Sequence, residues 1–263
     1  MSKYSDITKF TVKGTIYDFS NRSKYRGAWF TMLVNTYIAD NEAERLFVCH
    51  QIRKLQLFFP CLECKEHFGQ YLISHPPELE ASTRYGLFNW VIDFMSAVNK
   101  RIGKPEYDYK IIKKQFETFG FESANPLYDF SNHRKLRGIW MVLLVNSTNI
   151  RNNQDAKIFC KQIRKLQEYF PLPQQKEFFG QYLLEYPPEE EMTKTKGLFV
   201  WLVDYMNAFN KSRGKELYER YILYKEFHEP EFGACNSCDG EPPNEKAVEK
   251  RGIIRANPFR NSG

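Results

Sequence analysis

The chain contains one sequence twice, at a constant offset of 111 residues, and this duplication constrains the fold more than any other feature. Tyr17–Tyr107 aligns with Tyr128–Tyr218 without a gap, and Trp29, for example, recurs as Trp140. Each repeat is about as long as one ordinary domain, so the 263 residues fit two related domains in tandem.

The two repeats differ most informatively in one short segment. Residues 60–68 of the first repeat read PCLECKEHF, and the matching residues of the second read PLPQQKEFF. Cys61, Cys64 and His67 are therefore replaced, although their neighbours persist. The shared positions are mostly apolar, aromatic, Gly or Pro, as packing requires. We interpret the second repeat as a degenerate copy that kept the fold and lost the reaction.

The spacing of apolar residues predicts helices and no strands. Over residues 44–59 apolar side chains recur every three or four positions with charges between them, and Pro60 ends this run. Further helices are expected over about 23–39, 61–74 and 82–103. The expected fold is all-α: two small bundles of four to five helices.

The expected domains are a catalytic bundle over residues 1–122, a degenerate bundle over 123–233 and a flexible tail over 234–263. The tail is polar, contains Gly and Pro, and has a cysteine pair of its own, Cys235 and Cys238.

Composition argues against several functional classes. We expect no membrane partner and no secretion, because no long apolar run and no signal segment is present. Six cysteines are too few for a disulfide scaffold in a chain of this length. The net charge of +6 is mild and no nucleic-acid motif accompanies it, so we interpret it as a solvated surface.

Cys61 and Cys64 stand at the expected start of a helix, which suits disulfide chemistry. The free backbone N–H groups and the helix dipole favour the thiolate there, and one helical turn brings the two sulfurs within bridging distance. Lys65 and His67 add local positive charge. The sequence therefore predicts a redox-active pair in the first repeat.

The main alternative is a zinc site, in which Cys61 and its partner join Cys235 and Cys238 as four thiolate ligands. A non-catalytic, zinc-stabilised helical interaction module would result. We favour the redox interpretation and assign no metal, because zinc cysteines usually sit on turns. Cys49 and Cys160 fall in apolar helical runs, which favours buried free thiols over a bridge between the repeats.

The motif Cys61-x-x-Cys64-x-x-His67-Phe68 resembles the active site of the FAD-linked sulfhydryl oxidases of the Erv/ALR type. The resemblance spans most of the first repeat, through Arg26-x-x-Trp29, Pro76-Pro77, Trp90, Val98-Asn99-x-x-Ile102-Gly103-Lys104 and Tyr107. It is greatest to the versions encoded by large DNA viruses, which oxidise proteins in the cytoplasm of the infected cell.

The resemblance implies a thiol oxidase that forms disulfide bonds in protein substrates, reduces oxygen to hydrogen peroxide and holds FAD in a helical bundle. It implies that Cys64 lies against the flavin, that Cys61 exchanges with incoming thiols, and that Cys235 and Cys238 shuttle electrons to them. The FAD-lining residues that it implies are Arg26, Trp29, His67, Trp90, Asn99, Lys104 and Tyr107. It also implies a homodimer or an internal pseudo-dimer.

Some of these residues also have simple structural interpretations. His67 can be a core histidine, and Trp29 and Trp90 recur in the repeat without cysteines, which indicates a packing role. Asn99 and Lys104 recur as well, which suits a helix cap and a solvated charge.

Overall fold

The structure is a computed structural model that describes residues 26–59, 62–132 and 136–228. These residues form ten α-helices, two short 3-10 helices and no strand, so the all-α prediction is confirmed for the described part of the chain. The helices of the first repeat are α1 (Arg26–Tyr37), α2 (Glu42–Leu57), α3 (Leu62–Ser74), η2 (Pro77–Glu80), α4 (Gly86–Arg101) and α5 (Tyr109–Thr118). Those of the second are α6 (Gly138–Ser147), α7 (Asn153–Tyr169), α8 (Pro173–Glu185), η4 (Pro188–Glu191), α9 (Gly197–Ser212) and α10 (Arg220–His228).

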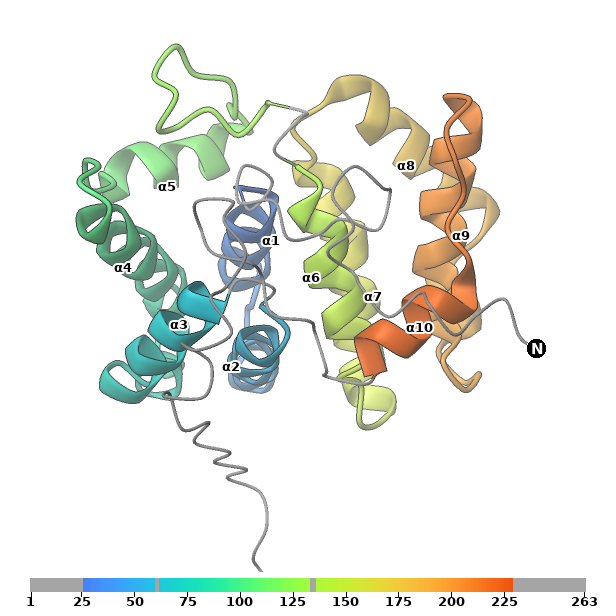
Figure 1. Ribbon diagram of the computed structural model, residues 1–263, viewed down its shortest axis with the longest axis horizontal. Coiled ribbons are helices and arrows are strands. Elements are labelled where there is room, and N and C mark those ends of the chain that lie inside the picture. The colour runs from blue at the N-terminus through green and yellow to red at the C-terminus, as the bar shows by residue number, and fades with distance from the viewer. Residues whose placement is uncertain (1–25, 60–61, 133–135, 229–263) are drawn as a thin grey trace, which may run out of the picture.

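The helices form two groups that meet along α1 and α6. In Figure 1 these two helices lie side by side in the middle, with α3, α4 and α5 on one side and α8, α9 and α10 on the other. Gly27 makes the close approach possible, because a Cβ atom there would lie 2.5 Å from the carbonyl oxygen of Leu136.

Contacts within the first group recur in the second at the same offset of 111. Arg53 pairs with Glu78 at 2.6 Å, and Arg164 pairs with Glu189 at 2.6 Å. Likewise the Trp90 indole donates to the His75 carbonyl at 2.8 Å. Its counterpart Trp201 donates to the Tyr186 carbonyl at the same distance. Equivalent residues therefore perform equivalent packing tasks in both groups.

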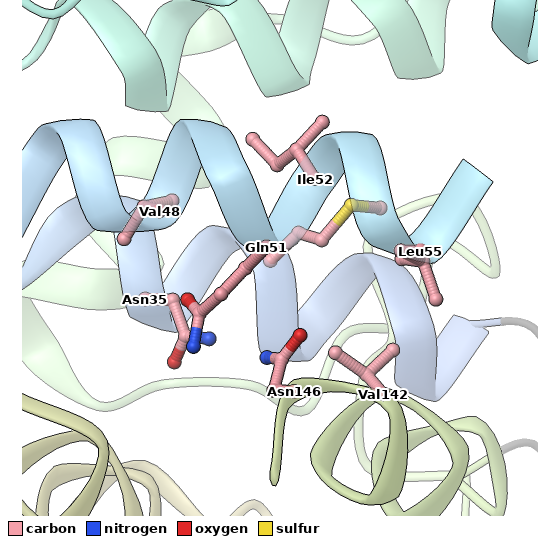
Figure 2. Close-up of a pocket in the computed structure, with 8 residues that line it drawn as sticks. Asn35, Val48, Gln51, Ile52, Leu55, Val142 and Asn146 are labelled. Atoms are coloured by element: carbon pink, nitrogen blue, oxygen red, sulfur yellow. The ribbon is translucent and has the colours of Figure 1, made fainter. Parts of the chain in front are cut away.

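Contacts between the two groups are reciprocal, as in a twofold interface. The buried amides of Gln51 and Gln162 donate to each other, at 2.7 and 2.9 Å. Figure 2 shows the nearby Asn35 and Asn146, which are also equivalent, pointing with Gln51 into a small cavity between α1, α2 and α6. The two groups thus pack through the same surface of each.

The start of one helix differs from the expectation. Helix α4 was expected to begin near residue 82 and begins at Gly86, since residues up to 85 form the turn after η2. Gly86 permits this turn, because a Cβ atom there would lie 2.1 Å from the Glu80 carbonyl oxygen.

The segment after α5 packs on the first bundle: Phe130 is fully buried and lies 5.8 Å from the ring of Phe30.

Within the described residues, no helix combines the length and the apolar composition needed to cross a membrane.

Cys49 and Cys160 are buried free thiols, as the favoured interpretation held, and burial raises the pKa of each to about 12.

Candidate active site

The candidate redox centre is at the start of α3. Cys64 lies in the first turn of this helix and packs, half-buried, against the core. The Gln56 side chain of α2 donates to the backbone carbonyl of Lys65 at 3.0 Å, which fixes this turn against α2. Cys61 lies outside the described residues, as do Cys235 and Cys238. The predicted helix start at residue 61 agrees to within one residue with the observed start at Leu62.

An aromatic cluster from α1, α3 and α4 lies behind this turn. Its centre is Phe94, whose ring centroid is 4.6 Å from those of Phe68 and Tyr71, 5.1 Å from Trp29 and 5.6 Å from Trp90. Burial raises the pKa of Tyr71 to about 12. The cluster supplies the apolar wall on which a planar cofactor ring can pack.

A polar group borders the cluster one turn beyond Cys64. The His67 Nδ1 atom lies 2.6 Å from the Glu63 backbone carbonyl, and Arg101 of α4 lies against the His67 ring. Arg101 is also 3.3 Å from the Glu63 carboxylate. His67 is only partly buried, which disfavours the core-histidine interpretation. The sequence analysis did not identify Arg101 as a site residue. The sequence shows Arg101 only as a basic residue in the last turn of a helix, which does not indicate a contact with His67.

Three predicted FAD residues have clear structural tasks. The Asn99 side chain donates to the Pro105 carbonyl at 2.8 Å and so ties the segment after α4 to the last turn of that helix. The Trp90 side chain is 4 % exposed and donates to the His75 carbonyl.

Arg26 is the third of these residues. Its guanidinium donates to the backbone carbonyls of Pro126, Leu127 and Asp129, all at 2.5 Å, and so ties α1 to the segment after α5. Its expected contact with FAD phosphates stays a prediction.

The other predicted FAD residues reach the surface. Lys104 is exposed, and Trp29 and Tyr107 are half-buried. The Tyr107 backbone N–H donates to Ser96 Oγ at 3.0 Å, which holds the segment after α4 against that helix. His67 and Arg26 are also half-buried, whereas Trp90 and Asn99 are buried.

The second repeat closes the equivalent space with rings. Phe178 and Phe209 replace His67 and Val98, and their centroids are 5.3 Å apart. Tyr205 replaces Phe94; it is fully buried, which raises its pKa, and the nearby Gln175 opposes that shift.

These differences bear on where FAD fits. Gln175 is the counterpart of Cys64, so the second repeat has a filled aromatic core where the first has a thiol and smaller side chains. The first repeat also has the His67 imidazole and the Arg101 guanidinium here, whereas Phe178 and Ser212 stand at these positions in the second repeat. Its residues therefore fit a flavin in part, and those of the second repeat do not.

Among the residues with described positions, no group of three or more His, Cys, Asp or Glu side chains is arranged to hold a metal ion. Three of the four thiols of the alternative zinc site lie outside those positions, so that alternative stays a prediction.

Residues 27–117 match the Erv1 / Alr family, whose members are FAD-linked sulfhydryl oxidases. The match runs from α1 to α5 and contains Cys61, Cys64 and His67, so it supports this general kind of function for the first repeat. It also supports a flavin cofactor, thiol-containing substrates and a dimeric tendency. No curated protein and no solved structure matches the chain.

Proposed function

We propose that the chain is an FAD-dependent sulfhydryl oxidase that forms disulfide bonds in protein substrates and passes the electrons to oxygen, giving hydrogen peroxide. The observation that carries the proposal is the position of Cys64, a half-buried thiol in the first turn of α3 in the repeat that matches the family. It packs against the hydrophobic core, on the helix that contributes Phe68 and Tyr71 to the aromatic cluster. A helix start favours the thiolate that disulfide exchange requires.

Each half-reaction has its own residues. Cys61 receives the substrate thiolate, and the mixed disulfide resolves to leave the substrate oxidised and Cys61 and Cys64 reduced. Bound FAD supplies the chemistry that takes two electrons from the thiols and passes them to oxygen. Cys64 is the thiol that we place next to the flavin, because its helix packs against the aromatic cluster.

We propose that the flavin ring packs at the aromatic cluster. Trp29 and Trp90 would lie beside it with Phe94, and His67 and Tyr107 would lie at its edge. The remaining proposed contacts are those of Arg26, Asn99 and Lys104.

We further propose that the second repeat is a degenerate copy without a flavin and that the tail cysteines Cys235 and Cys238 act as a shuttle. We also propose that the enzyme works in the cytoplasm, as the resemblance to the enzymes of large DNA viruses implies. The filled aromatic core around Tyr205 supports the first of these proposals.

Replacement of Cys64 by Ser tests the function. Oxygen consumption with dithiothreitol should fall at least about a hundredfold, because removal of one of two groups that act as a unit abolishes most of their effect. Cys49→Ser is the matched control: this thiol is buried with a pKa of about 12, so its loss should leave the rate unchanged. Full activity in Cys64→Ser would contradict the proposed reaction.

A further inference from the structure

The same five residues, YDFSN, begin both repeats, at 17–21 and at 128–132. The first copy lies outside the described residues, and the second packs on the bundle of the first repeat. Tyr128 and Phe130 are only 6 % and 0 % exposed there. We call residues 126–132 the arm, because they lead into the second repeat. The beginning of the second repeat is thus a part of the first bundle.

The arm holds the guanidinium of Arg26 in α1. The guanidinium donates at 2.5 Å to three backbone carbonyls of the arm, those of Pro126, Leu127 and Asp129. It also lies 5.3 Å from the centre of the Phe130 ring. Arg26 stands one helical turn before Trp29, which packs in the aromatic cluster. The arm therefore fixes the direction of a charged side chain that begins close to that cluster.

The arm also holds Tyr107 and the start of α5. The ring of Tyr128 packs edge-on against the Tyr107 ring, with centroids 5.8 Å apart and planes at 84°. The Tyr128 hydroxyl accepts from the Asp108 N–H at 2.8 Å, and its carbonyl accepts from the Gln115 side chain at 2.9 Å. Tyr107 is joined in turn to α4, since its N–H donates to Ser96 Oγ at 3.0 Å. Tyr128 thus fastens the segment between α4 and α5 at a residue that we propose to lie at the edge of the flavin ring.

The second repeat arranges the equivalent residues differently. Arg137, the counterpart of Arg26, donates to the hydroxyl of Tyr218 at 3.3 Å, and Tyr218 is the counterpart of Tyr107. Tyr218 is buried, with 8 % of its surface exposed, whereas Tyr107 is half-buried. In the first repeat the arm engages the arginine, and the tyrosine keeps part of its surface accessible.

We propose that the arm completes the cofactor site of the first repeat, and that Tyr128 is a positioning residue that acts on bound FAD through Tyr107. The inference rests on the proposed function, in which Tyr107 and Arg26 contact FAD. It gives the start of the second repeat a task in that site.

The two residues that the arm holds suit the two parts of a flavin dinucleotide. An aromatic ring packs on a planar cofactor ring, and a guanidinium binds phosphate oxygens. A guanidinium has five N–H donors, of which the arm uses three, so a phosphate contact of Arg26 is compatible with the arm contacts.

Removal of the Tyr128 hydroxyl tests the proposal on the full chain with its flavin bound. In Tyr128→Phe the Asp108 N–H loses its acceptor, so the segment that contains Tyr107 is held less firmly. The rate at which FAD leaves the protein, followed by the fluorescence of the released flavin, should rise about fivefold, the usual effect of one lost hydrogen bond. Tyr218→Phe is the matched control: it removes one accepting hydroxyl in the repeat that we propose to lack flavin, and should leave the rate unchanged.

A second experiment distinguishes positioning from a general loosening of the fold. Tyr128→Leu removes the ring that packs on Tyr107, and should change the visible circular dichroism of the bound flavin as well as speed the release of FAD. In a chain that already contains Tyr107→Leu, either replacement of Tyr128 should change the release rate by less than about twofold, because Tyr128 acts through Tyr107. If the Leu variant does not fold, Tyr128→Phe completes the same comparison.

Three results would overturn the inference. The first is a Tyr128→Phe protein that releases FAD as slowly as the parent chain. The second is an equal acceleration in Tyr218→Phe, because the effect would then be one of general stability. The third is additivity of the replacements at Tyr107 and Tyr128. A failure of the proposed function is distinguishable, because the parent chain itself would then purify without flavin.

Discussion

At the scale of single residues, two substitutions distinguish the candidate active site from its degenerate counterpart. His67 of α3 and Val98 of α4 are smaller than their counterparts Phe178 and Phe209, whose rings meet in the second repeat. The ring of Phe209 also lies parallel to that of Tyr205, at 6.5 Å and 7°. Ring stacking thus replaces the site that a planar ligand would need.

Transfer of these rings to the first repeat should remove the flavin. In the double variant His67→Phe, Val98→Phe, the two added Phe rings occupy the position proposed for the flavin ring. The purified variant should therefore contain less than about a tenth of the flavin that the parent chain contains. Absorbance in the visible region, relative to protein, measures it. Ile73→Phe adds a ring at a site on α3 that is 82 % exposed and should keep the flavin. Unchanged flavin in the double variant would place FAD elsewhere.

The Arg53–Glu78 ion pair should contribute to acid sensitivity. Its hydrogen bonds hold the pKa of Glu78 below the ordinary value of 4.5. The stabilisation is complete above that ordinary value and is lost as the pH falls through the lower pKa of the folded state. The pair is partly exposed, so we expect about 0.5 kcal/mol.

Urea unfolding at several pH values checks this expectation. Glu78→Gln should lower stability at pH 7 and make it less dependent on pH between about 5 and 3. Identical pH dependence of the variant and the parent chain would show that the pair contributes nothing.

At the scale of helices, most of the fold follows from sequence pattern. The apolar spacing before Pro60 predicts α2. In the structure Asn41 caps its start, where the Asn41 side chain accepts from the Glu44 N–H at 3.0 Å. The start of α4 was misplaced because residues 81–85 form a turn that brings Gly86 against the Glu80 carbonyl, and only then does the helix begin. Arg101 escaped notice because only the packing of α3 on α4 brings it to His67.

The paired glutamines between α2 and α7 should couple energetically. Gln51→Leu leaves the Gln162 amide buried without its partner, which should cost about 1–3 kcal/mol. Adding Gln162→Leu should recover much of this loss, because two apolar side chains then face each other. A double-mutant cycle by urea unfolding measures the coupling. Additive single effects would show that the hydrogen bonds are independent.

At the scale of the whole molecule, the two repeats act as partners within one chain. The largest contact joins α1 to α6, and reciprocal pairs such as Phe58 on Phe227 and Tyr169 on Phe116 flank it. We propose that this arrangement is the internal pseudo-dimer, one of the two options that the resemblance implies. It buries apolar faces of α1 and α2 that a single bundle would expose.

A fragment of residues 1–132 should therefore self-associate. The fragment keeps Phe130, which packs in the first bundle, and loses α6, the helix against which α1 packs. Light scattering across a range of concentrations should show dimers or aggregates, with loss of flavin. A stable monomer that retains flavin and full activity would show that the second repeat is not needed as a partner.

The flavin content of the purified full chain shows how many redox centres the protein has. We expect the visible spectrum to give one FAD per chain, because the redox centre is proposed for the first repeat and the second repeat has a filled aromatic core. Two flavins per chain would contradict the degenerate second repeat. A colourless protein with stoichiometric zinc would contradict the oxidase and establish the zinc-stabilised module in its place.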